Sequence, residues 1–462
     1  MFNATTKEAL KASTSVVIAL CLAMWFQWEK PYWAAIAVAV MALNETFAHS
    51  LQKGQNRLWG ALLGVAYALL LIALFSQQRF LFIAFYTLLL ASSLFMASDK
   101  KYGYIFVQGY TVCTIICCMG GFDSAYTFHF MILRVQETVL GIAVFTLVYK
   151  LLWPVTTQTV FIREYAKLHT QLYDCVTAAK QGVQQPDLPL ASLDALEQSA
   201  QKLHHLLELP NNGSCELQFH QRQWLERMRE IQVILHLLRS MEKQPSELCE
   251  YLDALQRNLD ATKSDHTPER TLLPTSLLRL AKRYAQHMPV PHHRTLKTHL
   301  QEDWRKVAQG VCTFLIAIAV WIYLPVPGGF VFPMIAGIFA TNLPPLPPGA
   351  IKDAFLGTLG LGVFYLGQYV FIMPSFTELW QLASFYFINL LAIWLVFDSP
   401  RWGIFRVLGV NLLLILTSSA LNLAPSYSFN TPLMMMAYVL IVLVIANTVS
   451  RFFHPHVHFA HA

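Results

Sequence analysis

Two residues of opposite charge lie three positions apart in an otherwise apolar stretch of this chain. Arg134 and Glu137 fall within the segment at approximately 129–153, and residues three apart share one face of an α-helix. An arginine's planar guanidinium can hold a carboxylate through two parallel hydrogen bonds, and a carboxyl group removed from water keeps its proton more readily. We therefore expect Arg134 to bind an anionic substrate and Glu137 to exchange a proton. An ion pair that only locks this helix to its neighbours is the alternative.

Polar residues also end two short apolar segments. Asn44 and Glu45 end the segment at approximately 32–48, and Asn342 ends the one at approximately 328–343. Two asparagines at matching places could coordinate a substrate or ion where short helices expose backbone groups. Helix capping and hydrogen bonding between helices are the alternative. Glu45 is the second candidate for proton coupling.

Arg57 and Trp33 complete the set of candidate substrate-binding residues. Arg57 lies near the predicted cytoplasmic end of its helix, where it could gather anions electrostatically or extend to the lipid headgroups. Trp33 is expected in an interfacial aromatic belt. If it turns inward, its indole offers a stacking surface to an aromatic acid.

The composition predicts an all-α integral membrane protein. Of 462 residues, 55% are hydrophobic and only 13% are charged, with a mean hydropathy of +0.44, which excludes an ordinary soluble globular class. Apolar windows of about 20 residues predict twelve spans, at approximately 10–27, 32–48, 57–76, 80–97, 102–119, 129–153, 305–324, 328–343, 354–374, 379–397, 403–422 and 431–453.

The loop charges predict the orientation of these spans. One side carries most of the basic residues, and the other carries little beyond Lys30 and Arg79. The rule that basic loops stay inside therefore places both termini and the central insert in the cytoplasm. The basic residues on the cytoplasmic side are Lys7, Lys11, Lys53, Arg57, Lys100, Lys101, Lys150, Arg163, Arg305, Lys306, Lys352, Arg401, Arg406 and Arg451.

The pattern divides the chain into three parts. Residues 1–155 and 304–462 each hold six predicted spans, and 156–303 reads as a cytoplasmic bundle of amphipathic helices. The helices of the insert are predicted at 157–183, 192–209, 216–243 and 245–262. We interpret the basic residues of the insert as a solvated face near anionic lipid headgroups.

The two apolar parts match each other at a constant offset. A shift of 298 residues places Asn44 on Asn342 and Gly64 on Gly362, without a gap across 28–67 and 326–365. An even number of spans in each half makes the repeats parallel. Duplicated membrane halves are typical of transporters, because a site between them can open to either side in turn.

No sequence pattern indicates catalysis, a cofactor or a metal centre. Nothing matches a phosphate-binding glycine loop, a nucleophile elbow or H-E-x-x-H, and the eight cysteines include no C-x-x-C pair. The histidines of the tail at 454–461 could hold a metal weakly, but we interpret that tail as disordered. We expect a protein that is not an enzyme.

Three local motifs resemble the fusaric acid resistance family, which includes aromatic acid exporters and is related to the plant aluminium-activated malate transporters. They run from Lys30 to Ala35, from Arg57 to Gly64, and from Arg134 to Gly141. The layout of six spans, an insert and six more spans is similar to that family over nearly the whole chain. Ala61 stands where the family usually has threonine, and Phe355 stands opposite Arg57 in the second half.

The resemblance implies efflux of small organic anions, mostly aromatic carboxylic acids, across a bacterial inner membrane, and the position of Glu137 leads us to expect that protons drive it. A gated anion channel and a membrane scaffold that does not transport are the alternative functions. The expected partners are the organic anion and membrane lipids, with no nucleic acid. A homo-oligomer and a periplasmic adaptor protein both stay open.

Overall fold

The computed structural model of this protein is helical, and the residues that it describes include no strand. They form two compact units, the larger of residues 1–44, 53–154 and 294–462 and the smaller of residues 45–52 and 155–293. The described residues are 4–43, 47–99, 102–120, 124–153, 157–181, 190–208, 219–221, 224–225, 227–228, 231–232, 235, 296–324, 326–327, 329–346, 348–399, 402–422 and 424–453.

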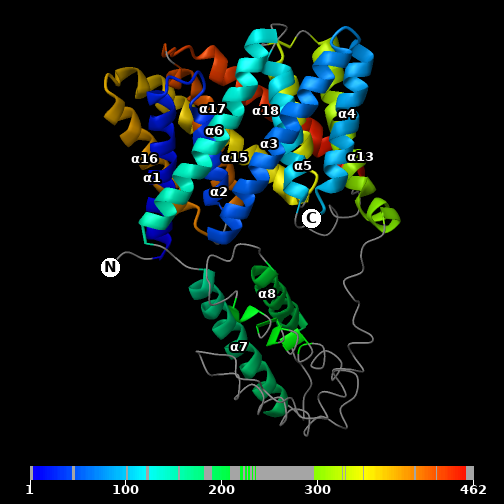
Figure 1. The fold of residues 1–462 in the computed structure, drawn as a ribbon, viewed down its shortest axis with the longest axis vertical. Coiled ribbons are helices and arrows are strands. Elements are labelled where there is room, and N and C mark those ends of the chain that lie inside the picture. The colour runs from blue at the N-terminus through cyan, green and yellow to red at the C-terminus, as the bar shows by residue number, and fades with distance from the viewer. Residues whose placement is uncertain are drawn as a thin grey trace. The chain divides into compact units, whose positions relative to one another are not determined.

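Eight described helices are long and apolar enough to cross a membrane, which confirms the all-α membrane class. Figure 1 shows them gathered with the shorter apolar helices in one bundle. The eight are α1 (Ala4–Trp25), α3 (Phe47–Phe75), α4 (Arg79–Met96), α6 (Ser124–Leu151), α13 (Leu296–Tyr323), α15 (Pro348–Phe371), α16 (Leu379–Val396) and α18 (Asn430–Phe453).

Four shorter apolar helices occupy the remaining predicted span positions. They are α2 (Tyr32–Ala42), α5 (Gly103–Met119), α14 (Val331–Asn342) and α17 (Gly403–Leu416). At about 1.5 Å per residue, the 11 residues of α2 extend only about 16 Å, roughly half of a hydrocarbon core about 30 Å thick. The window 102–119 agrees with α5 to within one residue. The window 32–48 is longer than α2, which ends at Ala42, and the window 403–422 is longer than α17, which ends at Leu416 before the 3₁₀ turn Ser418–Leu421.

Helices distant in the chain pack side by side in the larger unit. α1 packs against α16, and α13 packs against α4 (Figure 1). α2 packs against α6 and α17, while α14 packs against α18 and α5. Each short helix α2 and α14 therefore contacts the last helix of its own apolar part and the fifth helix of the other.

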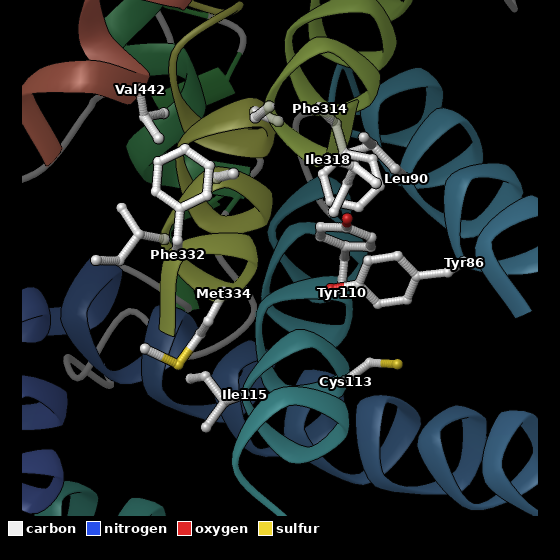
Figure 2. Packing of buried hydrophobic residues seen from close by; sticks show 14 of the residues in the cluster. Tyr86, Leu90, Tyr110, Cys113, Ile115, Phe314, Ile318, Phe332, Met334 and Val442 are labelled. Carbon is white, nitrogen blue, oxygen red and sulfur yellow. The ribbon is translucent and has the colours of Figure 1, made fainter. Parts of the chain in front are cut away.

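The core between the two apolar parts is built mainly of aromatic and aliphatic side chains. In Figure 2, Tyr86 of α4 and Tyr110 of α5 lie beside Phe314 of α13, and the ring centroids of Tyr86 and Phe314 are 5.3 Å apart. The Tyr86 hydroxyl donates to Thr114 Oγ1 at 2.7 Å. In this way α4 is joined to α5 by a polar contact inside an apolar core.

A similar contact joins α16 to α17. Tyr386 OH and Thr417 Oγ1 are 2.6 Å apart, and both side chains are buried. Buried hydroxyls are costly unless they are hydrogen-bonded, so each contact fixes the register of its two helices.

The smaller unit contains the helices α7 (Thr157–Gln181) and α8 (Leu190–Glu208), close to the predicted positions 157–183 and 192–209. Their buried leucines form a core that includes Leu168, Leu172 and Leu203. The helix predicted at 245–262 and most of the one predicted at 216–243 lie outside the described residues.

Two helices begin well before the apolar windows that predicted them. α3 begins at Phe47 and α13 at Leu296, because a helix continues into polar sequence that a hydropathy window does not detect. Lys11 was expected in a cytoplasmic flank. It lies instead inside α1 with a side chain only 2% exposed, where it pairs with Glu8 at 3.0 Å and approaches the Tyr149 ring.

Candidate functional site

Arg134 and Glu137 lie at the middle of α6. Glu137 is 13 residues from Ser124 and 14 from Leu151, so an ion pair on this helix is about 20 Å from either end. The exposed fractions of the two side chains are only 4% and 1%, and Arg134 Nη2 contacts Glu137 Oε2 as an ion pair. The predicted i, i+3 pair is therefore present and removed from water.

The pair leaves polar atoms without hydrogen bonds. Arg134 Nε and Glu137 Oε1 are buried and have no hydrogen-bond partner in the structure. Such groups are costly to bury and usually find a partner. The site therefore has one guanidinium donor and one carboxylate oxygen available to a bound molecule.

The short helix α2 lies against α6 at this level. Residue numbers rise together on both helices, because Arg134 lies beside Trp33 and Gly141 lies beside Ala34 and Ala37. A Cβ atom at Gly141 would be 2.7 Å from Ala37 Cβ and 3.0 Å from Ala34 O, so only glycine allows this approach. The first turn of α2 is therefore about 15 Å along α6 from Ser124.

Two aromatic rings contact the Arg134 guanidinium. Its Cζ atom lies 4.8 Å from the ring centroid of Trp33 and 4.8 Å from that of Phe130, within the range of a cation–π contact. Trp33 thus faces the ion pair. This inward position is the alternative to the interfacial aromatic belt that the sequence predicted. Rings on the guanidinium restrict its rotation and leave its N–H edge for hydrogen bonding.

The turn between α1 and α2 adds two charges. Lys30 Nζ lies 5.2 Å from the centroid of the Phe130 ring, and Tyr126 OH donates to Glu29 Oε2 at 3.4 Å. Burial lowers the pKa of the Lys30 ammonium group, and the neighbouring positive charge of Arg134 lowers it further. An anion bound near Lys30 would therefore stabilise the charged form of its ammonium group.

Arg57 of α3 is buried rather than extended to the lipid headgroups. Its side chain is 8% exposed, and its Nη1 atom donates to Tyr104 OH at 3.2 Å. Its charge is close enough to act on Arg134, although the two arginines come from different helices. The structure thus brings Arg57, Trp33, Arg134 and Glu137 into one region.

We call Glu29, Lys30, Arg57, Arg134 and Glu137 the charged cluster. Each of its members acts electrostatically on another member. Three cations against two carboxylates leave an excess of one positive charge among these described residues. A region of low dielectric with that excess attracts an anion.

The remaining predicted site residues are not brought into this cluster by the described structure. Asn342 is exposed at the end of α14, and its amide nitrogen donates to Ile338 O of the same helix at 2.8 Å. Asn44 and Glu45 lie outside the described residues. The role predicted for the two asparagines therefore stays a prediction.

Three residues of this region were not predicted as site residues. Lys30 was noted only as a rare basic residue on the outer side and as the start of a family motif, and Glu29 and Tyr104 were not noted at all. The signal for Lys30 was its position directly before Pro31 and Tyr32 at the head of a short helix. The contact between Tyr104 and Arg57 joins residues 47 positions apart, and no local spacing indicates it.

Comparison with known proteins gives one finding. The family model described as the fusaric acid resistance protein family matches residues 7–273, which is more than half of the chain. No curated protein and no solved structure matches it. The matched stretch includes α1 to α6 and every member of the charged cluster. This multi-pass membrane protein therefore belongs to the fusaric acid resistance protein family.

Proposed function

We propose that this protein is a transporter that exports small organic anions, chiefly aromatic carboxylates, across a bacterial inner membrane. The observation that carries the proposal is the buried Arg134–Glu137 pair at the middle of α6, with Arg134 held against Trp33 and Phe130. Charges inside a membrane are costly, and they usually mark a substrate or ion pathway.

The carboxylate of the substrate would bind at the N–H edge of Arg134. The unpartnered Nε atom supplies one donor, and the first turn of α2 points the positive end of its helix dipole into the same region. Half-length helices whose N-termini face anionic groups are typical of transporter binding sites. Lys30 and Arg57 add positive charge around this position.

The aromatic preference rests on the rings near Arg134. Trp33, Phe130 and Tyr126 lie on adjoining faces of α2 and α6, and the rings of Tyr126 and Phe130 are stacked at 6.2 Å. A flat aromatic substrate gains offset-stacked or edge contacts with such rings, each worth about 0.5–1.5 kcal/mol beyond the area that it buries.

Glu137 would carry the proton. While it is ionised, it neutralises Arg134 and competes with the substrate carboxylate. When it takes up a proton, Arg134 is released to bind the anion, so protonation and substrate binding are coupled. A proton and an anion that are bound together would leave together, so net export would need an outward gradient of the anion that exceeds the inward gradient of the proton.

The pairing of helices supports a duplicated architecture of two parallel six-helix repeats. Helices α13–α18 can be numbered as a second set of six. The first helix of each set then packs against the fourth helix of the other set, as α1 does against α16 and α13 against α4. The second helix of each set packs against the fifth helix of the other, as α2 does against α17 and α14 against α5. Movement of one half against the other would open the site to each side in turn. The basic residues in the loops of one side support a cytoplasmic position for both termini.

An export assay tests the assignment of Arg134. We expect an Arg134→Met variant that reaches the membrane to lose export of benzoate, while Arg134→Lys retains part of it. Arg79→Met is the matched control, because Arg79 is an exposed arginine at the start of α4. Export by Arg134→Met at the rate of the unchanged protein would refute the role of this residue.

A gated anion channel is the second candidate, favoured by the excess positive charge of the charged cluster. A channel passes current that follows the membrane voltage and does not need a proton gradient. Export that carries a proton with the anion should change in rate when the pH gradient is collapsed at constant voltage. Benzoate flux that stays the same under that condition would favour the channel.

A further inference from the structure

Arg57 is a buried cation without a counter-ion among the described residues. It lies ten residues inside α3, and 92% of its side-chain surface is covered. No described carboxylate lies within ion-pair distance, and its buried Nε atom has no hydrogen-bond partner. Arg134 differs from it, because Arg134 is neutralised by Glu137.

An uncompensated guanidinium in a membrane helix is energetically unfavourable. Removing one partner of a buried ion pair is strongly destabilising, because the remaining charge is left without compensation. The single neutral hydrogen bond from Arg57 Nη1 to Tyr104 OH offsets only part of such a cost. Arg57 is therefore in a position that an anion would stabilise.

A second basic residue, Lys53, lies near Arg57, and the helices around them are tightly packed. Lys53 Nζ lies 5.2 Å from the centroid of the Tyr104 ring, and Tyr104 OH is also 3.4 Å from Gln108 Oε1. Two glycines of α3 allow its backbone to approach α5 closely. A Cβ atom at Gly60 would be 2.7 Å from Ile105 O, so the helix that carries Arg57 is tightly held.

Arg57 lies further along α6 than Arg134, toward its C-terminal end. A Cβ atom added at Gly54 of α3 would lie 3.4 Å from Ile142 Cγ1 of α6. Arg57, three residues further along α3, acts electrostatically on Arg134. The two helices therefore run in opposite directions, and Arg57 lies at a level between Ile142 and Arg134. The predicted orientation places this side of the pair toward the cytoplasm.

We infer that Arg57, with Lys53, forms a second anion-binding site on the cytoplasmic side of the Arg134–Glu137 pair, while Tyr104 only holds Arg57 against α5. The ligand is the carboxylate of a small organic anion. This inference rests on the proposed function for its direction of transport. The anion binds first at Arg57, while Glu137 occupies Arg134, and moves to Arg134 when Glu137 is protonated.

Benzoate binding to the full-length protein in lipid nanodiscs tests this site. A charge-assisted hydrogen bond contributes about 1.5–3 kcal/mol, so we expect Arg57→Met to weaken benzoate binding about 10- to 100-fold. Arg57→Lys keeps the charge and should stay within about 3-fold of the unchanged protein. Thermal unfolding and gel filtration show whether each variant is folded.

Tyr104→Phe is the matched control for a merely structural role. It removes the hydrogen bond that anchors Arg57 but leaves the guanidinium and the ring beneath Lys53. We expect its benzoate affinity to change by less than about 3-fold. A loss in Tyr104→Phe equal to that in Arg57→Met would overturn the inference, because Arg57 would then act only as a link between α3 and α5.

Transport from each side separates this inference from the proposed function. Arg57→Met should raise the KM for benzoate offered at the cytoplasmic face of inside-out vesicles, with little change in kcat. Unchanged KM and affinity in Arg57→Met, beside lost export in Arg134→Met, would overturn the second site alone. Absence of benzoate binding in the unchanged protein would overturn both proposals.

Discussion

Replacing Glu137 by glutamine should increase the affinity of this protein for organic anions. The substitution keeps the shape of the side chain but removes the negative charge that is paired with Arg134. In the unchanged protein, an entering carboxylate has to compete with that charge for the same guanidinium. In Glu137→Gln, Arg134 is free to bind at any pH.

The size of the effect follows from the charges involved. Two unit charges about 4 Å apart interact by about 4 kcal/mol at an effective dielectric constant of about 20. Part of this energy is offset, because the freed guanidinium bonds to the new amide. If about 1.4–2.8 kcal/mol remains, benzoate should bind about 10- to 100-fold more tightly to Glu137→Gln at neutral pH.

Two measurements check this prediction. Isothermal titration should show benzoate affinity that falls as pH rises in the unchanged protein, since Glu137 loses its proton, and that stays nearly constant in Glu137→Gln. Benzoate should also raise the melting temperature of Glu137→Gln more than that of the unchanged protein, because bound anion stabilises the folded state by mass action. Gradient-driven export should be lost.

Glu29→Gln is the matched control. Glu29 lies in the turn before α2 and accepts a hydrogen bond from Tyr126 rather than pairing with Arg134. Its substitution also removes one negative charge from the charged cluster, but it frees no donor of Arg134, so the gain in benzoate affinity should be clearly smaller than in Glu137→Gln. Equal affinities and equal pH profiles in Glu137→Gln and the unchanged protein would show that the Arg134–Glu137 pair is purely structural.

Two further predictions concern the packing that supports the site. Gly141→Ala should lower both the melting temperature and export, because its Cβ would lie 2.7 Å from Ala37 Cβ and would push α2 away from α6; an unchanged melting temperature would refute this close contact. Tyr386→Phe should cost about 1 kcal/mol of stability through the lost contact with Thr417, measured by thermal unfolding. Benzoate affinity should not change in Tyr386→Phe, and a large loss would place α16 and α17 in the binding pathway.

Hydropathy predicted the positions of uniformly apolar helices well. The windows 80–97 and 379–397 agree with α4 and α16 to within one residue at each end, because polar residues bound these segments sharply. The predictions were less accurate where a helix extends beyond the lipid. α3 begins ten residues before its predicted start, since its first turns are polar, and hydropathy measures apolar character rather than helix formation.

Local spacing predicted only the contacts within one helix. Arg134 and Glu137 meet because i, i+3 neighbours share a face of any α-helix, so their pairing could be read from sequence. The contacts of Arg134 with Trp33 and of Arg57 with Tyr104 depend on which helices become neighbours. Counting basic residues in flanking segments also gives no depth, which is why Lys11 and Arg57 were expected near the surface but are buried.

The two apolar parts differ in chemistry where the proposed duplication would make them equivalent. At the offset of 298 residues, Trp33 corresponds to Val331, Arg57 to Phe355 and Arg134 to Pro432. In the second part, Tyr438 of α18 packs edge-on against Phe332 of α14 and donates to Pro327 O. The second part thus joins α14 to α18 by neutral contacts, at positions that correspond to Ala34 and Leu140, and none of its described residues forms an ion pair there.

This difference has a consequence for transport. An anion passing through two chemically equivalent halves would meet two arginine sites related by symmetry, and binding would be expected at both. Here the buried cations proposed to bind the anion, Arg57 and Arg134, both come from the first half. The second half contributes apolar helices such as α14 and α17, which pack on α5 and α2. We therefore expect one half to bind the anion and the other to act as the surface against which it moves, with a single substrate pathway in each chain.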